Sequence, residues 1–250
     1  MTIDAAARRA AFRRLHEEGS LILLNPWDLG SLRRIEALGA KAIASTSAGF
    51  AESRGRIDYQ MSRDEVVAHL RELCAATDLP VNADFESGFA DSTRELGQSV
   101  RLAVDAGVAG LSIEDRSGSG LYPLETAVER LRTARAAIDA SGHDVMLVAR
   151  CEGFLTRTAG IEEVVARLRS YAEAGGDVLY APGANKPEEI KAIVAAVAPK
   201  PVNVLLFPGM NAKEVFALGV RRISTGSFLA DAAWEALDAT ARSVLEEGHY

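Results

Sequence analysis

The chain has 250 residues, of which 48% are hydrophobic and 25% charged, as is typical of a globular protein with room for a sizeable core. Its net charge of -7 argues against binding to a nucleic-acid backbone, which requires clustered lysine and arginine. Cys74 and Cys151 are too few for a disulfide framework or a metal site built from cysteine.

The N-terminal stretch, residues 1–19, is charged and helix-like and lacks the apolar core of a signal peptide. No apolar run approaches the length of a membrane-spanning helix. We therefore expect an N-terminal helix within residues 1–20 and a cytoplasmic protein with no nucleic-acid or membrane partner.

From residue 21 onward, short apolar runs rich in β-branched residues alternate with longer stretches of helical period. The runs predict eight strands, at 21–24, 41–46, 80–85, 110–114, 145–150, 178–181, 202–207 and 222–225. The remaining stretches predict helices at 29–38, 63–76, 93–106, 124–140, 161–174, 187–197, 212–218 and 228–246. Several of these helices end at a glycine suited to a C-cap, such as Gly107 and Gly175.

Strands that alternate with helices are typical of α/β proteins with a parallel sheet. Eight such units in 250 residues fit one (β/α)8 barrel of the TIM type. A doubly wound open sheet is the alternative, but no Gly-x-Gly-x-x-Gly follows the first strand. No linker or composition shift is present, so we expect a single domain over residues 1–250, with a C-terminal helix within 227–250.

Acidic residues gather at the predicted strand ends, where such a barrel carries its active site. In the stretch VNADFESGF, residues 81–89, Asn82, Asp84 and Glu86 alternate and should share one face of the strand. Glu114 ends the next strand. Each acid alone could cap a helix or pair with an arginine. Together they favour a hard cation, because converging carboxylates need positive charge to stay ionised, and oxygen ligands suit Mg²⁺ or Mn²⁺.

Two further strand ends allow more than one interpretation. Arg150 is either an ion-pair partner of Glu152 or Glu114, or it binds a substrate carboxylate or phosphonate in bidentate fashion. The segment 45–49, Ser-Thr-Ser-Ala-Gly, is either a turn or a set of amides presented to an anion. No histidine lies at a strand end, which argues against a zinc hydrolase or a Ser-His-Asp triad.

Five separated motifs resemble the isocitrate lyase/phosphoenolpyruvate mutase superfamily. They are NPWDLGSLRRIEALGAKAIASTSAGFAESRGRIDYQMSRDE, PVNADFESGF, LSIEDRSG, MLVARCEGF and PVNVLLFPGMNAKEVFALGVRRISTGS, and the likeness covers residues 21–233. The resemblance implies a (β/α)8 barrel that binds Mg²⁺ and an α-oxo or enol carboxylate, and that often forms tetramers by swapping its last helix.

The resemblance also implies roles for individual positions. Asp84, Glu86 and Glu114 match acids around the metal, and Asp58 matches an acid that helps to hold its water shell. Thr46, Ser47 and Ala48 match the loop that holds the substrate carboxylate. Arg150 matches the substrate-binding arginine. Arg150, Glu114 and Asp58 are the expected catalytic residues.

Two departures from the family pattern shape the expected function. Glu86 stands where an aspartate is usual, so it contacts the metal either directly or through water. The loop 115–122, Asp-Arg-Ser-Gly-Ser-Gly-Leu-Tyr, lacks the Lys-x-Cys-Gly-His motif of isocitrate lyases and the Lys and Asn of the mutases. Arg116 and Tyr122 are the evident charge-bearing or proton-handling replacements in this loop.

We therefore expect a Mg²⁺-dependent lyase that cleaves a C–C bond in a small 2-oxo or 2-hydroxy (di)carboxylate through a metal-stabilised enolate. The alternatives are C–P bond chemistry, of the phosphoenolpyruvate mutase or phosphonopyruvate hydrolase type, and a barrel that binds a 2-oxo acid without catalysis.

The last predicted helix carries an apolar stripe that must be buried somewhere. Packing on its own barrel and exchange between subunits are both open from the sequence. The family habit predicts a homodimer or homotetramer.

Overall fold

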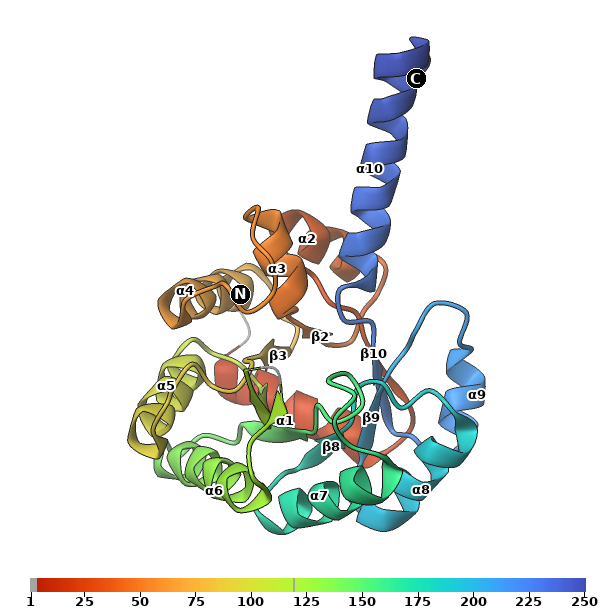
Figure 1. Ribbon diagram of the computed structural model, residues 1–250. Coiled ribbons are helices and arrows are strands. Elements are labelled where there is room, and N and C mark those ends of the chain that lie inside the picture. Colours follow the sequence, from red (N-terminus) through yellow and green to blue (C-terminus); the bar gives the residue numbers. More distant parts are fainter. Residues whose placement is uncertain (1–3, 119) are drawn as a thin grey trace.

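The computed structural model describes residues 4–118 and 120–250 as a barrel of eight parallel strands surrounded by helices (Figure 1). Neighbouring strands follow the order β1-β10-β9-β8-β7-β4-β3-β2. A parallel bridge between Leu24 and Ile43 links the two ends of this order. The strands are β1 Leu21–Leu23, β2 Ile43–Ala44, β3 Val81–Asp84, β4 Gly110–Glu114, β7 Met146–Arg150, β8 Val178–Tyr180, β9 Val202–Leu205 and β10 Arg222–Ser224. The predicted (β/α)8 barrel is therefore confirmed.

Helices occupy the stretches of helical period and begin where the sequence supplies caps. Ser62 and Ser92 each accept a bond from the amide three residues on, while the glutamate at that position bonds back to the serine. The helices are α1 Ala5–Glu17, α2 Leu29–Ala37, α3 Ser47–Ser53, α4 Arg63–Ala76, α5 Thr93–Asp105, α6 Leu124–Ala140, α7 Ile161–Glu173, α8 Pro187–Val197, α9 Ala212–Ala217 and α10 Phe228–Glu247. Gly107 and Gly175, after α5 and α7, have positive φ angles of 97° and 104°, as their C-cap role requires.

Two elements near the carboxyl ends of the strands differ from the sequence prediction. The segment 45–49, for which a turn and a set of anion-binding amides were both open, leads into the short helix α3. The loop after β4 forms a small antiparallel hairpin of β5 (Arg116–Ser117) and β6 (Gly120–Leu121). Of the expected N-terminal helix, residues 1–3 lie outside the described part of the chain.

The barrel is closed at its amino end and open at its carboxyl end. Phe12 of α1 is fully buried in one cluster with Leu21, Ala109 and Met146, which lie at the starts of three strands. A larger apolar cluster fills the space between the sheet and the surrounding helices. The opposite, carboxyl end carries Asp84 and Arg150, which are half-buried, and Glu114, which is buried.

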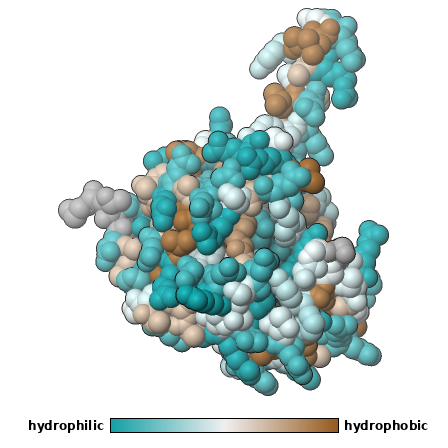
Figure 2. All heavy atoms as spheres, turned by 60° about the vertical axis from the view of Figure 1, so that its left-hand side comes forward, coloured by the Kyte–Doolittle hydropathy of each residue, from teal (hydrophilic) through white to brown (hydrophobic). Residues whose placement is uncertain are grey.

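The last helix, α10, extends away from the barrel (Figure 1). Ala230, near its start, is its buried residue, whereas Leu237 and Leu245 are 56% and 86% exposed. Hydrophobic surface is visible on this projecting helix (Figure 2). Most of the apolar stripe is therefore not buried on its own barrel. Across the described residues, no helix combines the length and the apolar character needed to cross a membrane.

Candidate active site

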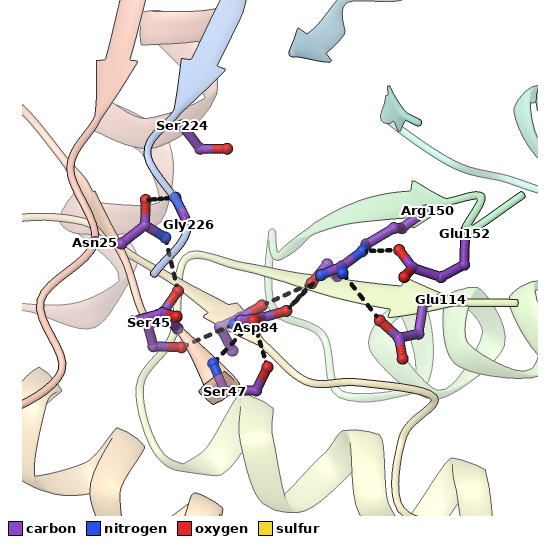
Figure 3. A network of polar contacts seen from close by, with 12 residues as sticks. Asn25, Ser45, Ser47, Asp84, Glu114, Arg150, Glu152, Ser224 and Gly226 are labelled. Carbon is purple, nitrogen blue, oxygen red and sulfur yellow. Dashed lines mark hydrogen bonds and ion pairs between the residues drawn. The ribbon is translucent and has the colours of Figure 1, made fainter. Parts of the chain in front are cut away.

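Asp84 lies at the centre of the open end, at the last position of β3 (Figure 3). Its Oδ2 accepts bonds from the backbone amide and the hydroxyl of Ser47, both at 2.9 Å. Its Oδ1 accepts bonds from the Ser112 hydroxyl at 3.3 Å and from Arg150 at 3.1 Å. The start of α3, the middle of β4 and the end of β7 thus together fix this carboxylate at the end of β3.

Arg150 joins three carboxylates through three different nitrogens. Its Nη1 lies 3.1 Å from Asp84, its Nη2 lies 3.4 Å from Glu114, and its Nε bonds to Glu152. Burial opposes the charge of the guanidinium, but Glu152, Glu114 and Asp84 together raise the pKa of Arg150 well above its ordinary value. Arg150 is therefore an ion-pair partner, one of the two roles that the sequence left open.

The site holds more carboxyl groups than the single positive charge of Arg150 can balance. Burial, followed by Asp84, Glu114 and Asp58, raises the pKa of Glu86 to about 9. Burial and Asp84 raise the pKa of Asp58, and burial raises that of Glu114 against the lowering effect of Arg150. Binding of protons or of a cation would therefore stabilise the site.

Glu86 reaches the site by a route that strand alternation does not describe. Its backbone is left-handed, with φ of 46°, because β3 has already ended at Asp84. Its carbonyl accepts a bond of 3.0 Å from the amide of Glu114. Among the described residues, no partner bonds to its buried Oε1. An unsatisfied buried carboxylate oxygen of this kind costs about 1–3 kcal/mol.

Tyr59 belongs to the site, although the sequence analysis assigned it no role. Its hydroxyl donates to Glu114 over 2.7 Å, and burial and Glu114 raise its pKa. It follows Asp58 directly and has a positive φ of 66°. The guanidinium of Arg116, in the hairpin after β4, lies 4.1 Å from the centre of the Tyr59 ring. Only the folded loop shows this arrangement, since a tyrosine beside an acid is not a signal by itself.

The residues expected to hold the substrate carboxylate lie at the start of α3. Thr46 is its N-cap, and its Oγ1 accepts a bond of 3.3 Å from the amide of Gly49. Ser47 gives both donors to Asp84, and Ala48 is half-buried beside it. Of the three, Ser47 contacts Asp84 directly, and carboxylate binding by Thr46, Ser47 and Ala48 stays a prediction.

The opposite wall of the site is built around Asn25, a residue that sequence reasoning missed. Its Oδ1 accepts bonds from the amides of Thr225 and Gly226 at 2.9 and 3.0 Å, and its Nδ2 donates to the Ser45 carbonyl at 2.8 Å (Figure 3). Asn25, Asp84 and Arg150 share the lining of a cavity of about 40 Å³. Asn25 thereby ties the chain after β1 to the chain after β10 at the rim of this cavity.

The acids form a negatively charged pocket, but they are not arranged as a complete set of metal ligands. Within residues 4–118 and 120–250, no group of three or more His, Cys, Asp or Glu side chains is arranged to hold a metal ion. Yet the unpartnered Glu86 oxygen and the raised pKa values of Glu86 and Asp58 are what an acidic pocket shows when it lacks positive charge. Oxygen donors of this type suit Mg²⁺, which usually keeps several of its waters.

The fold and the site define an α/β barrel of enzyme type, with a carboxylate-rich centre at the carboxyl ends of its strands. The chain belongs to the phosphoenolpyruvate phosphomutase family, which matches residues 12–245. This match confirms the resemblance to the isocitrate lyase/phosphoenolpyruvate mutase superfamily.

Three relatives illustrate the match. An uncharacterized protein of Mycobacterium tuberculosis is 31% identical over 237 residues, which span 94% of this chain and 88% of that protein. Oxaloacetate decarboxylase of Pseudomonas putida is 27% identical over 233 residues, or 87% of this chain and 78% of that enzyme. A candidate lyase/mutase from Burkholderia cenocepacia J2315, solved by crystallography, has 40% sequence identity to this chain. The two structures match with a TM-score of 0.95 over 98% of this chain and 91% of that one.

Proposed function

We propose that this protein is a Mg²⁺-dependent lyase that cleaves a C–C bond in a small 2-oxo or 2-hydroxy carboxylate. The observation that carries the proposal is the arrangement around Arg150, where one guanidinium and an excess of carboxyl groups converge at the open end of the barrel. A relative that decarboxylates oxaloacetate supports C–C cleavage.

The residues around Asp84 would organise the metal and the substrate. Asp84, Glu86 and Glu114 would hold Mg²⁺, directly or through water, with Asp58 supporting its water shell. When bound, the ion would act as a Lewis acid toward the substrate oxygens. The buried ion pairs fix Asp84 and Glu114 before substrate arrives, so little reorganisation is needed during the reaction.

Tyr59 and Arg150 would control charge next to the reacting centre. Tyr59 keeps its proton over a wide pH range because its pKa is raised, and it holds Glu114 by a hydrogen bond. Arg150 offsets part of the repulsion between Asp84 and Glu114. Both residues oppose the rise in the pKa of Glu114 and hold its carboxylate in place, and a divalent cation requires such an ionised carboxylate.

A substrate screen tests the proposal. The purified protein is incubated with 2-oxo and 2-hydroxy carboxylates, with and without Mg²⁺, and pyruvate or glyoxylate release is measured. Release that depends on Mg²⁺ and is lost in Asp84→Ala supports a C–C lyase. Phosphate release from phosphonopyruvate would instead assign C–P chemistry. Binding of 2-oxo acids without any turnover would leave a barrel that has lost catalysis.

The same proposal includes assembly with further copies of the chain. The projecting α10 exposes Leu237, Val244 and Leu245, and an exposed apolar helix face calls for a partner surface. A homodimer or homotetramer in which α10 packs on a neighbouring barrel would bury this face.

A further inference from the structure

We propose that Arg116 binds the second carboxylate of a dicarboxylate substrate and so selects dicarboxylates over monocarboxylates. This inference rests on the proposed function, because it assigns the distal end of the substrate whose 2-oxo or 2-hydroxy end meets the metal. It names a specificity residue in the hairpin after β4, where the sequence departs from the family motifs.

The first argument is that Arg150 is already paired with three carboxylates of the protein. Its Nε and Nη1 donate hydrogen bonds to Glu152 and Asp84, and its Nη2 forms an ion pair with Glu114 at 3.4 Å. With Glu86 and Asp58 nearby, a dianionic substrate would enter a site that is rich in negative charge. A second cation, besides the metal at the 2-oxo or 2-hydroxy end, would favour binding of its second carboxylate.

The second argument is the placement of Arg116. Its guanidinium stacks on the Tyr59 ring at 4.1 Å, and the hydroxyl of the same tyrosine bonds to Glu114. Arg116 thus stands one phenol ring away from the acidic centre. Among the contacts of the described residues, its only hydrogen bond runs from Nε to the Gly118 carbonyl, at 3.0 Å, and no carboxylate pairs with it. A guanidinium stacked on an aromatic face keeps its in-plane N–H donors for a carboxylate.

The third argument is that the base of the hairpin is fixed. The Asp115 carbonyl accepts a bond from the Tyr122 amide at 2.8 Å. The Asp115 carboxylate accepts bonds from the Tyr171 hydroxyl at 2.6 Å and from the Glu152 amide at 2.8 Å. Since both ends of the hairpin are tied to buried groups, Arg116 is presented from a defined position.

Another buried arginine near the cavity does not meet the requirement. Arg222 lines the small cavity, but it starts β10, at the end of the barrel that α1 closes. Its Nε donates to Asn203 over 2.8 Å, and its Nη1 lies 3.4 Å from the His16 ring. It therefore faces away from the mouth.

The test compares lactate with malate, which share the 2-hydroxy carboxylate and differ by the second carboxylate. Calorimetry with saturating Mg²⁺, on both enantiomers of each acid, gives the two affinities for every variant. We expect wild type to bind malate more tightly than lactate. Arg116→Gln should weaken malate binding roughly tenfold to a hundredfold, as expected for a lost charge-assisted bond. Lactate affinity should stay within about twofold, since that acid does not reach Arg116.

Controls separate selectivity from misfolding. Arg157→Gln removes an exposed arginine from the loop after β7, at the same end of the barrel, and should change neither affinity. Arg116→Lys keeps the charge without the planar fork and should lose part of the preference for malate. Because lactate is measured on the same preparation, it reports whether each variant retains a folded site.

Four outcomes would overturn the inference. They are unchanged malate affinity in Arg116→Gln, equal losses for both acids, loss of the preference in Arg157→Gln instead, and a wild type without any preference for malate. If wild type binds neither acid with Mg²⁺, the proposed function fails and this inference fails with it. Binding of both acids with no effect of Arg116→Gln removes the inference alone.

Discussion

Replacing Arg150 with lysine tests whether the guanidinium organises the acids even before a ligand binds. Lysine keeps the positive charge but offers one ammonium group in place of a planar fork. In the structure, three separate nitrogens of Arg150 reach Asp84, Glu114 and Glu152. A single ammonium on a shorter head group cannot satisfy all three, so at least one buried carboxylate loses its partner.

The size of the effect follows from the burial of the network. The side chains of Glu114 and Glu152 are each 1% exposed and that of Arg150 is 14% exposed, so solvent replaces little of what is lost. One hydrogen bond to a charged group is worth about 1.5–3 kcal/mol, and we expect Arg150→Lys to lower the free energy of unfolding by about 3 kcal/mol. For a chain of this size that corresponds to a fall in Tm of roughly 6–12 °C.

Thermal and urea denaturation at neutral pH without added metal measure this change. Arg33→Lys is the matched control, because Arg33 pairs with Glu36 on the surface and is 61% exposed. Its substitution should alter stability by less than about 0.5 kcal/mol. If Arg150→Lys stays within about 1 kcal/mol of wild type, the guanidinium geometry is not what holds the acids.

Three further outcomes are expected. Asp84→Ala should abolish Mg²⁺-dependent binding of oxalate in calorimetry, and unchanged affinity in a folded variant would reject Asp84 as the centre of the metal site. Glu86 has a folded pKa of about 9 against an ordinary 4.5, so its contribution to stability is full below pH 4.5 and is lost as the pH rises toward 9. Metal-free Glu86→Gln should therefore gain about 2–4 kcal/mol over wild type near pH 8 and much less near pH 5, as measured by denaturation at both pH values. Light scattering should give a dimer or tetramer that Leu237→Asp weakens, and a monomeric wild type at micromolar concentration would contradict the assembly.

The strand ends could be predicted from sequence because adjacent parallel strands finish at a common edge. Glu114 and Arg150 lie opposite each other in the register of β4 and β7. The residues that end two separate sequence motifs therefore form one ion pair. Hydrophobic runs and cap residues locate strands and helices well, since both depend on short-range patterns. The acids and the arginine of the site lie at the ends of such patterns.

The loops could not be predicted in the same way. The α3 segment begins Ser-Ala-Gly, which has weak helix propensity, and it is helical because Thr46 caps it and Phe50 and Ala51 are buried. Tyr59 and Asn25 enter the site through contacts with residues 55 and 200 positions away. Contacts over such distances arise from tertiary packing, and no local pattern in a single sequence announces them.

Glu86 shows how a sequence pattern can indicate the right place for an incomplete reason. Alternation along β3 correctly sends Asn82 and Asp84 to the same cavity, but it stops at Asp84, where the strand ends. Beyond that point, the bond from the Glu114 amide to the Glu86 carbonyl fixes a left-handed turn that returns the side chain to the acids.

Glu86 therefore combines an unfavourable backbone region, an unpartnered buried oxygen and a strongly raised pKa. Each is a cost to stability, and strained residues of this kind persist where the surrounding structure holds them and cluster at functional sites. Asp84, in contrast, has partners at both oxygens and is stable without any ligand. Asp84 thus serves as the fixed point of the site, and Glu86 is the group whose unmet interaction a proton or a cation would satisfy.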